Sequence, residues 1–221
     1  MRIKKPLLRL ARIKGGLLVG NRIVGMAALG CVALMVSACS GGSPTSTGES
    51  APGPTSSTTS LPYAGAPKVA NPLPASALSG DPCTDALTPE QVKTAIGVEV
   101  QGKHKDVAAL GPYCSWFNPA SLGRVAVSFT INTHDGLSGV YQNTQPQSPN
   151  WKEIPAIQGF PAVVTDTSTS NCAISVGLAD EFTIDVSGDL GESRRGKVDP
   201  CDITSQFADL MITTLKKKAG A

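Results

Sequence analysis

Alternating apolar and polar residues, or a short apolar run, mark five segments in the second half of the chain. The clearest alternation places Val125, Val127 and Phe129 on one face of a single segment. A period of two residues predicts a half-buried β-strand. We therefore predict strands at residues 113–117, 124–132, 160–165, 171–178 and 181–187. The short gap between the last two segments predicts a hairpin.

A different spacing predicts helices on both sides of this β-rich region. Residues 201–217 carry one apolar stripe at helical spacing and end in three lysines, which suit the negative end of a helix dipole. Nearer the N-terminus, Thr88-Pro89-Glu90-Gln91 is a capping box, and Gly97 marks the end of the helix it opens. A shorter helix is predicted at residues 136–143, with Asp135 as its cap.

These elements predict one α+β domain over residues 81–218, followed by a tail at 219–221. A helix, several antiparallel strands and a closing helix are typical of a sheet that carries its helices together. We expect an antiparallel β-sheet with an N-terminal and a C-terminal helix packed on one face. Two disulfides are expected to staple this domain.

The first 38 residues have the features of a secretory signal peptide. They contain seven basic residues and no acidic one, and residues 23–35 form an apolar run. That run is too short for a permanent membrane-spanning helix, which needs about 20 residues. Val36-Ser37-Ala38-Cys39 resembles a bacterial lipobox, so we expect a lipid on Cys39. Cys31 fits this pattern less well, and an uncleaved anchor is the third alternative.

Residues 39–80 are predicted to be a lipid-anchored, disordered linker. Ser, Thr, Pro, Gly and Ala dominate the segment, and Glu49 and Lys68 are its only charged residues. A composition of this kind buries too little apolar surface to fold. The segment is expected to hold the domain away from the membrane, and its Ser/Thr/Pro clusters are candidates for glycosylation.

The charge of the mature chain argues against a nucleic-acid partner. Of the 19 basic residues, seven belong to residues 1–38, which leaves 12 against 17 acidic residues. A protein that binds nucleic acid through its phosphates needs the opposite balance, with basic residues gathered on one face.

Four cysteines remain after the signal peptide and the anchor, and an even number in an exported domain predicts two disulfides. Cys83 and Cys201 each follow Asp-Pro at a predicted helix start, whereas Cys114 and Cys172 lie in predicted strands. This likeness of context favours Cys83–Cys201 and Cys114–Cys172 among the three pairings. No C-x-x-C occurs and neither histidine has ligand spacing to a cysteine, so we expect no metal and no cofactor.

A search for catalytic motifs finds none, so we expect the protein not to be an enzyme. The chain contains no G-x-S-x-G, no S-x-x-K and no phosphate-binding glycine loop. His134-Asp135 could form an oriented base, but the surrounding residues favour a polar turn after a strand. His104, between two lysines, is predicted to lie in a solvated loop.

Trp151 is the candidate ligand contact. Most aromatic residues fall on predicted core faces, but Trp151 follows the polar stretch 142–150 and could lie at the rim of a cleft. Core packing is the alternative for this side chain. Residues 154–161 are predicted to form an exposed apolar loop.

Four motifs together carry a resemblance to a known family: Asp81-Pro82-Cys83, Cys114-Ser115-Trp116, Asn171-Cys172 and Asp199-Pro200-Cys201. The domain resembles a family of uncharacterised actinobacterial lipoproteins of the mycobacterial type, which carry a domain of unknown function marked by paired Asp-Pro-Cys motifs. The resemblance covers residues 80–218. It implies a place in the cell envelope and a disulfide framework, and it implies no activity.

The function expected from these observations is a non-catalytic binding or accessory module on the outer face of the cytoplasmic membrane. Its partners would be the membrane, through the lipid anchor, and another envelope protein, a glycan or a lipid. The alternatives are an envelope hydrolase with an unrecognised active site and a purely structural surface protein. Loss of hydrolysis in a folded His134→Ala variant would favour the hydrolase.

Overall fold

The structure, a computed structural model, describes residues 60–221. The predicted signal peptide, the lipidation site at Cys39 and the first part of the predicted linker lie outside these residues. None of the helices in the described part has the length and apolar character needed to cross a membrane.

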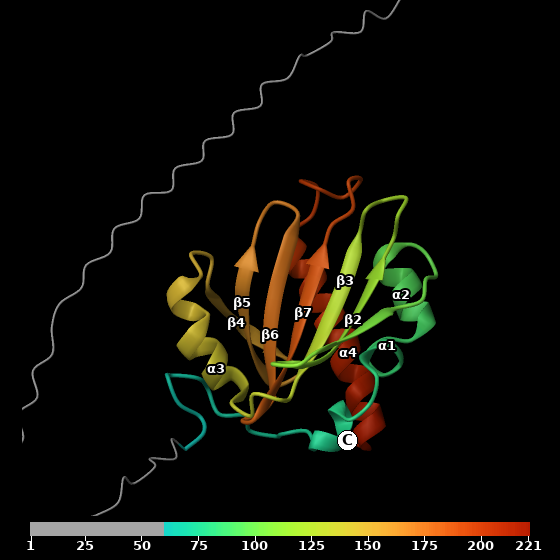
Figure 1. Cartoon of the computed structure of the whole chain (residues 1–221). Coiled ribbons are helices and arrows are strands. Elements are labelled where there is room, and N and C mark those ends of the chain that lie inside the picture. Colours follow the sequence, from blue (N-terminus) through green and yellow to red (C-terminus); the bar gives the residue numbers. More distant parts are fainter. Residues whose placement is uncertain (1–59) are drawn as a thin grey trace, which may run out of the picture. The chain divides into compact units, whose positions relative to one another are not determined.

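A seven-stranded antiparallel sheet forms the centre of the domain, in the order β1-β2-β3-β7-β6-β5-β4 (Figure 1). The strands are β1 (Lys103–Val107), β2 (Gly111–Phe117), β3 (Arg124–Thr130), β4 (Lys152–Ile157), β5 (Phe160–Thr167), β6 (Asn171–Ala179) and β7 (Phe182–Asp189). The five predicted strands are all present, and the predicted hairpin joins β6 to β7. The antiparallel sheet of the predicted fold class is thus confirmed.

Alternation divides the sheet into two chemically different faces. On the central strand β7, Ile184 and Val186 point to the main core, together with Ile174 of β6 and Val127 of β3. Their neighbours in the sequence point to the opposite face, where polar side chains predominate. This division follows directly from the period of two along each strand.

The long C-terminal helix α4 (Pro200–Ala219) covers the apolar face. It packs on β6 and β7 and lies behind the strands in Figure 1. Phe207, Met211, Ile212 and Leu215 are buried along one stripe, and each such side chain contributes about 1.5–3 kcal/mol when fully buried. The predicted C-terminal helix is therefore confirmed, and it includes Ala219, which was assigned to the tail.

Two shorter helices precede the sheet, α1 (Pro82–Asp85) and α2 (Pro89–Ile96), and α2 contacts β2 and β3. The capping box of α2 is present, because Thr88 Oγ1 accepts a hydrogen bond from the Gln91 amide and Gln91 Oε1 accepts one from the Thr88 amide. Gly97 ends the helix with a φ of 79°, in the left-handed region that glycine adopts without strain.

Residues 60–80 belong to the folded domain, so the predicted domain start at residue 81 is wrong. The amide of Leu73 donates a hydrogen bond to the carbonyl of Leu178, and the amide of Val69 donates one to Asp180 Oδ1. The short 3₁₀ helix η1 (Ala75–Leu78) then buries Leu78 completely in the main core. These apolar residues fold because the sheet supplies a surface for them, which composition alone does not reveal.

All four domain cysteines form disulfides, but the favoured pairing is wrong. The bonds are Cys83–Cys114 and Cys172–Cys201. Each one joins the first turn of a helix to the strand beneath it. The favoured partners Cys114 and Cys172 lie on β2 and β6, three strand spacings or roughly 14 Å apart. Bonded cysteines need Cα atoms within about 7 Å of each other.

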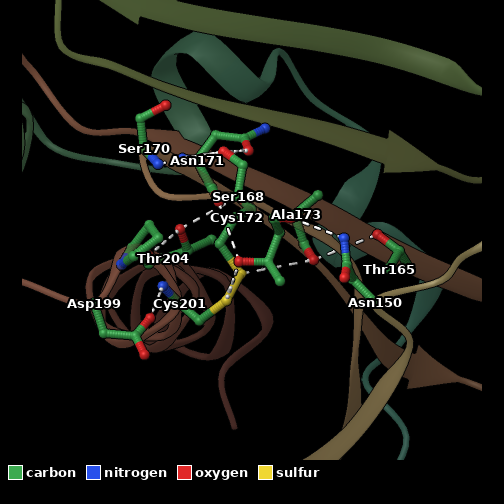
Figure 2. The surroundings of a disulfide bond; sticks show 12 residues. Asn150, Thr165, Ser168, Ser170, Asn171, Cys172, Ala173, Asp199, Cys201 and Thr204 are labelled. Carbon is green, nitrogen blue, oxygen red and sulfur yellow. Dashed lines mark hydrogen bonds between the residues drawn. A yellow bond between two sulfur atoms is a disulfide. The ribbon is translucent and has the colours of Figure 1, made fainter. Parts of the chain in front are cut away.

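Figure 2 shows how the second disulfide fastens the start of α4 to β6. The carboxylate of Asp199 accepts a hydrogen bond from the Cys201 amide at 2.7 Å. The hydroxyl of Thr204 lies 2.8 Å from the carbonyl of Pro200 and 3.4 Å from that of Cys172. The Asp199 cap, the disulfide and the Thr204 hydroxyl therefore all hold the first turn of α4 against β6.

The two outermost strands, β1 and β4, were not predicted. His104 was placed in a solvated loop and lies in β1, and residues 154–161 were taken as an exposed apolar loop but contribute to β4 and β5. Four of the five residues of β1 are exposed. An edge strand with water on both faces has no reason to alternate, so its sequence carries no strand signal.

Candidate functional site

The face of the sheet opposite α4 is covered in part by one short helix, α3 (Gly136–Asn143), which lies where it was predicted. Gly177 of β6 permits this packing. A Cβ atom at that position would come within 2.8 Å of Leu137 Cδ1. The short 3₁₀ helix η2 (Gln145–Gln147) follows α3.

A cavity of about 380 Å³ lies between α3 and strands β3, β7, β6 and β5. Its sheet wall carries hydroxyl and carboxylate side chains, and its other wall comes from α3 and the turns around it. The polar side chains of the lining are Ser128, Thr130, Thr133, Asp135, Asn143, Thr144, Thr165, Ser175 and Asp185. We call this space the acidic cavity, because Asp135 and Asp185 carry the only charges in its lining.

Asp185 occupies the middle of the sheet wall. Asp185 lies on β7, where it is paired with Ser128 of the neighbouring strand β3 on one side and with Ser175 of β6 on the other. Directly opposed residues of antiparallel strands share a face, so these three side chains form one polar row. The row lies on the sheet's central strands, where the backbone is held on both sides.

Three hydroxyl groups donate hydrogen bonds to the carboxylate of Asp185: those of Ser175, Thr130 and Thr183. Burial raises the pKa of this carboxyl above its ordinary value of 3.8, and the three hydroxyls act in the opposite direction by stabilising the charged form. The side chain keeps some exposure toward the cavity. It is thus a largely desolvated acid at the edge of an accessible space.

Ser128 has a buried side-chain hydroxyl without a hydrogen-bond partner. Its side chain is 7 % exposed and lines the acidic cavity. Its Oγ is the one buried side-chain polar atom of residues 60–221 without a hydrogen-bond partner in the protein. A buried hydroxyl that lacks a partner costs about 1–3 kcal/mol, so native structures rarely retain one without a reason.

The predicted ligand contact, Trp151, lies outside the lining of the acidic cavity. Its ring packs edge-on against Tyr141 of α3, with centroids 4.9 Å apart, in a small second core with Leu137 and Val163. The hydroxyl of Tyr141 donates to Glu153 Oε1, and burial together with this carboxylate raises the pKa of Tyr141 to about 12. A ligand contact at the half-buried Trp151 stays a prediction.

Neither histidine lines the acidic cavity. His134 lies in the turn after β3, as predicted, and its side chain is exposed. His104 on β1 lies with Nδ1 2.8 Å from Asp81 Oδ1 and Nε2 3.1 Å from Asp106 Oδ1. These hydrogen bonds, that of Asp81 first, raise the pKa of His104. The contact with Asp81 ties the start of α1 to β1.

A metal at His104 is not supported by the donor set. Asp81, Cys83 and His104 lie within 4.8 Å of one another, but the sulfur of Cys83 is bonded to Cys114. A disulfide sulfur is no thiolate ligand. Asp81 Oδ1 also accepts the Cys83 amide as the cap of α1. The group is better explained as local structure.

A second groove of about 840 Å³ runs beside the first disulfide. Its lining includes Leu87, Val92, Val100 and the indole of Trp116. The groove also carries the polar side chains of Thr84, Glu99 and Gln101, but its one charged residue, Glu99, is exposed and it holds no buried polar side-chain atom without a hydrogen-bond partner. The acidic cavity is the better candidate site, because it combines a desolvated carboxylate with an unsatisfied hydroxyl.

Sequence reasoning missed Asp185 and Ser128. Both are polar residues inside an alternating strand, which is visible in the sequence. The alternation, however, predicts only that such residues face solvent. What the pattern could not show is that α3 shelters this side, or that pairing brings Ser128, Ser175 and Asp185 into one row.

Comparison with known proteins assigns a family but no activity. A family model described as "Protein of unknown function (DUF3558)" matches residues 34–214. Neither the curated proteins nor the solved structures gave a match.

Proposed function

The chain belongs to the DUF3558 family of proteins of unknown function, and we propose that it is a lipid-anchored module that binds a small polar ligand in the bacterial cell envelope. It would sit on the outer face of the cytoplasmic membrane and act without catalysis. The observation that carries the binding role is the acidic cavity, where Ser128 Oγ has no partner beside Asp185.

The anchor rests on the sequence of residues 1–39. A basic start, an apolar run and the lipobox-like Val36-Ser37-Ala38-Cys39 support export and lipidation at Cys39. Two disulfides within the domain fit an oxidising compartment. The actinobacterial lipoprotein origin suggested by the Asp-Pro-Cys motifs belongs to this proposal as well.

Binding suits the chemistry of the acidic cavity better than catalysis does. Three hydroxyls already donate to Asp185, which fixes the carboxylate in one orientation. No histidine lines the cavity to act as a base for a serine or threonine. A row of hydrogen-bonding groups held on the central strands of a sheet suits a specific binding site.

The binding role is tested on the full-length lipoprotein, extracted from membranes in mild detergent. Its melting temperature is measured against a collection of small polar envelope metabolites. We expect at least one compound to raise the melting temperature of the wild type and of Ser187→Ala, and to lose its effect on Ser128→Ala. Ser187 is a matched control because it lies two residues after Asp185 on β7, on the same face of the sheet as Asp185, but outside the cavity lining.

The absence of any ligand-dependent shift, or an equal shift in Ser128→Ala, would contradict a binding role for this cavity. The anchor has its own test in intact-mass spectrometry of the membrane-extracted chain. A diacylglycerol on Cys39, lost together with membrane association in Cys39→Ser, is expected. An unmodified Cys39 in the membrane-bound wild type would contradict the anchor.

A further inference from the structure

The charges that line the acidic cavity have one sign only. Asp185 stands on the sheet wall and Asp135 at the start of α3, and the lining contains no lysine, arginine or histidine. The ion pairs of residues 60–221 involve His104 and Lys218 and do not include either aspartate. Buried carboxylates are normally paired with a cation, because desolvation penalises an isolated charge.

Asp135 is free to contribute to a ligand. It precedes α3, but its side chain makes no capping hydrogen bond to the helix. The carboxylate folds instead over the first turn, where Gly139 leaves room for it. A Cβ atom at position 139 would lie 2.2 Å from Asp135 Oδ2. The missing side chain of Gly139 thus keeps an acidic group at the helix wall of the cavity.

Ser128 provides the independent sign that the two acids belong to a binding site. Its Oγ is buried, lacks a partner and stands next to Asp185 in the polar row. A hydroxyl can donate to a ligand oxygen or accept from a ligand hydroxyl. The cavity therefore offers two carboxyl groups and one adjacent neutral hydrogen-bonding group.

We infer that the ligand carries a primary ammonium group next to a hydroxyl group, with the ammonium held by Asp185 and Asp135 and the hydroxyl bound by Ser128. This inference rests on the proposed binding function and specifies its ligand class. An ammonium supplies three donors and the positive charge that the lining lacks. A neutral polyol would leave both carboxylates uncompensated, and an anion would be repelled by them.

The size of the cavity limits the ligand to about a single sugar ring or less. Its volume of about 380 Å³ lies near the lower end of the roughly 300–1,000 Å³ of small-molecule sites. An amino sugar and the ethanolamine unit of a lipid headgroup share the required chemistry, and separate probes distinguish them.

The test is isothermal titration of the full-length lipoprotein in detergent at about pH 6.5, where primary amines are protonated. The four probes are glucosamine, N-acetylglucosamine, glucose and ethanolamine. We expect glucosamine or ethanolamine to bind at least about ten-fold more tightly than glucose and N-acetylglucosamine. Tighter binding of glucosamine than of ethanolamine would identify the sugar, and the reverse would identify the headgroup.

Variants test whether the preference for an amine depends on the acidic cavity. Asp185→Asn is expected to lower the affinity for the amine at least about ten-fold, whereas Asp189→Asn, on the same strand but outside the lining, should leave it unchanged. Asp135→Asn, at the cavity's helix wall, provides the same test if Asp185→Asn does not fold.

Two outcomes would overturn the inference. Glucose binding as tightly as glucosamine, with Ser128→Ala weakening both, would refute the ammonium and leave the binding function standing. Binding of none of the four probes would also refute the ligand class, while the broader metabolite screen decides separately whether the cavity binds a ligand at all.

Discussion

Removal of one disulfide at a time should destabilise the domain by a predictable amount and also report the pairing. The first change is Cys83→Ala with Cys114→Ala, and the second is Cys172→Ala with Cys201→Ala. Each double variant deletes one bridge and leaves no unpaired thiol behind, provided that the bonds are those of the structure.

The magnitude follows from the loops that the bridges close. The bonded cysteines are 31 and 29 residues apart in the sequence. In the chain-entropy model, loops of this length correspond to about 3.7 and about 3.6 kcal/mol at 25 °C. The two loops do not overlap, so the losses should add to about 7 kcal/mol when both bridges are removed. A loss of that size approaches the whole stability of a typical domain.

The assay combines urea unfolding without reductant with a titration of free thiols in the unfolded chain. We expect each double variant to lose about 3–4 kcal/mol of unfolding free energy, with no free thiol in the domain. Under either other pairing, Cys83→Ala with Cys114→Ala would break both bridges and expose two thiols. Two thiols would refute the pairing, and a loss below about 1 kcal/mol would refute the entropic estimate.

Three further predictions concern the core and the acidic cavity. Leu78→Ala should lower the unfolding free energy by about 2–5 kcal/mol in urea titrations, because Leu78 is fully buried although it lies in the predicted linker; a neutral result would remove residues 60–80 from the core. Gly102→Ala should cost about 1–3 kcal/mol in the same assay, since its Cβ would lie 2.3 Å from a disulfide sulfur, and unchanged stability would contradict this close packing. Burial raises the pKa of Asp185 above 3.8, so the folded state binds this proton more tightly than the unfolded chain does. Its contribution to stability is therefore present at low pH and is lost as the pH rises from 3.8 through the folded pKa. Asp185→Asn should gain stability relative to wild type over that range, and a difference that stays constant with pH would refute the raised pKa.

The sequence was informative where one side of an element is buried and the other is not. Residues 124–130 alternate between apolar and polar because their apolar side chains face the main core. The helix α4 carries a stripe of apolar residues because one of its sides packs on the same core. β1 gives no such signal, since both of its faces are exposed to water. Burial creates the pattern that sequence reasoning detects, so an edge strand remains hidden from it.

Contacts that depend on strand order could not be predicted. Four cysteines in an exported domain predict two bridges, but the partners depend on which strand lies beneath each helix start. β3 and β7 separate β2 from β6, and this order brings Cys114 under α1 and Cys172 under α4. Nothing in the spacing of the cysteines contains that order.

The candidate site also depends on the order of the strands in the sheet. Ser128, Ser175 and Asp185 are spread over 58 positions of the chain and become neighbours only through the pairing of β3, β7 and β6. Each one alone reads as an ordinary polar residue of a half-buried strand. The unusual feature is their common shelter under α3, which belongs to the tertiary structure.

The binding of a small ligand in the acidic cavity is tested most directly by backbone amide spectra of the isotope-labelled full-length protein in detergent, titrated with glucosamine. We expect saturable shifts that cluster around Ser128, Ser175 and Asp185 and at the start of α3, and that disappear in Ser128→Ala. Spectra that do not change at saturating amine, or shifts confined to residues away from these strands, would contradict it.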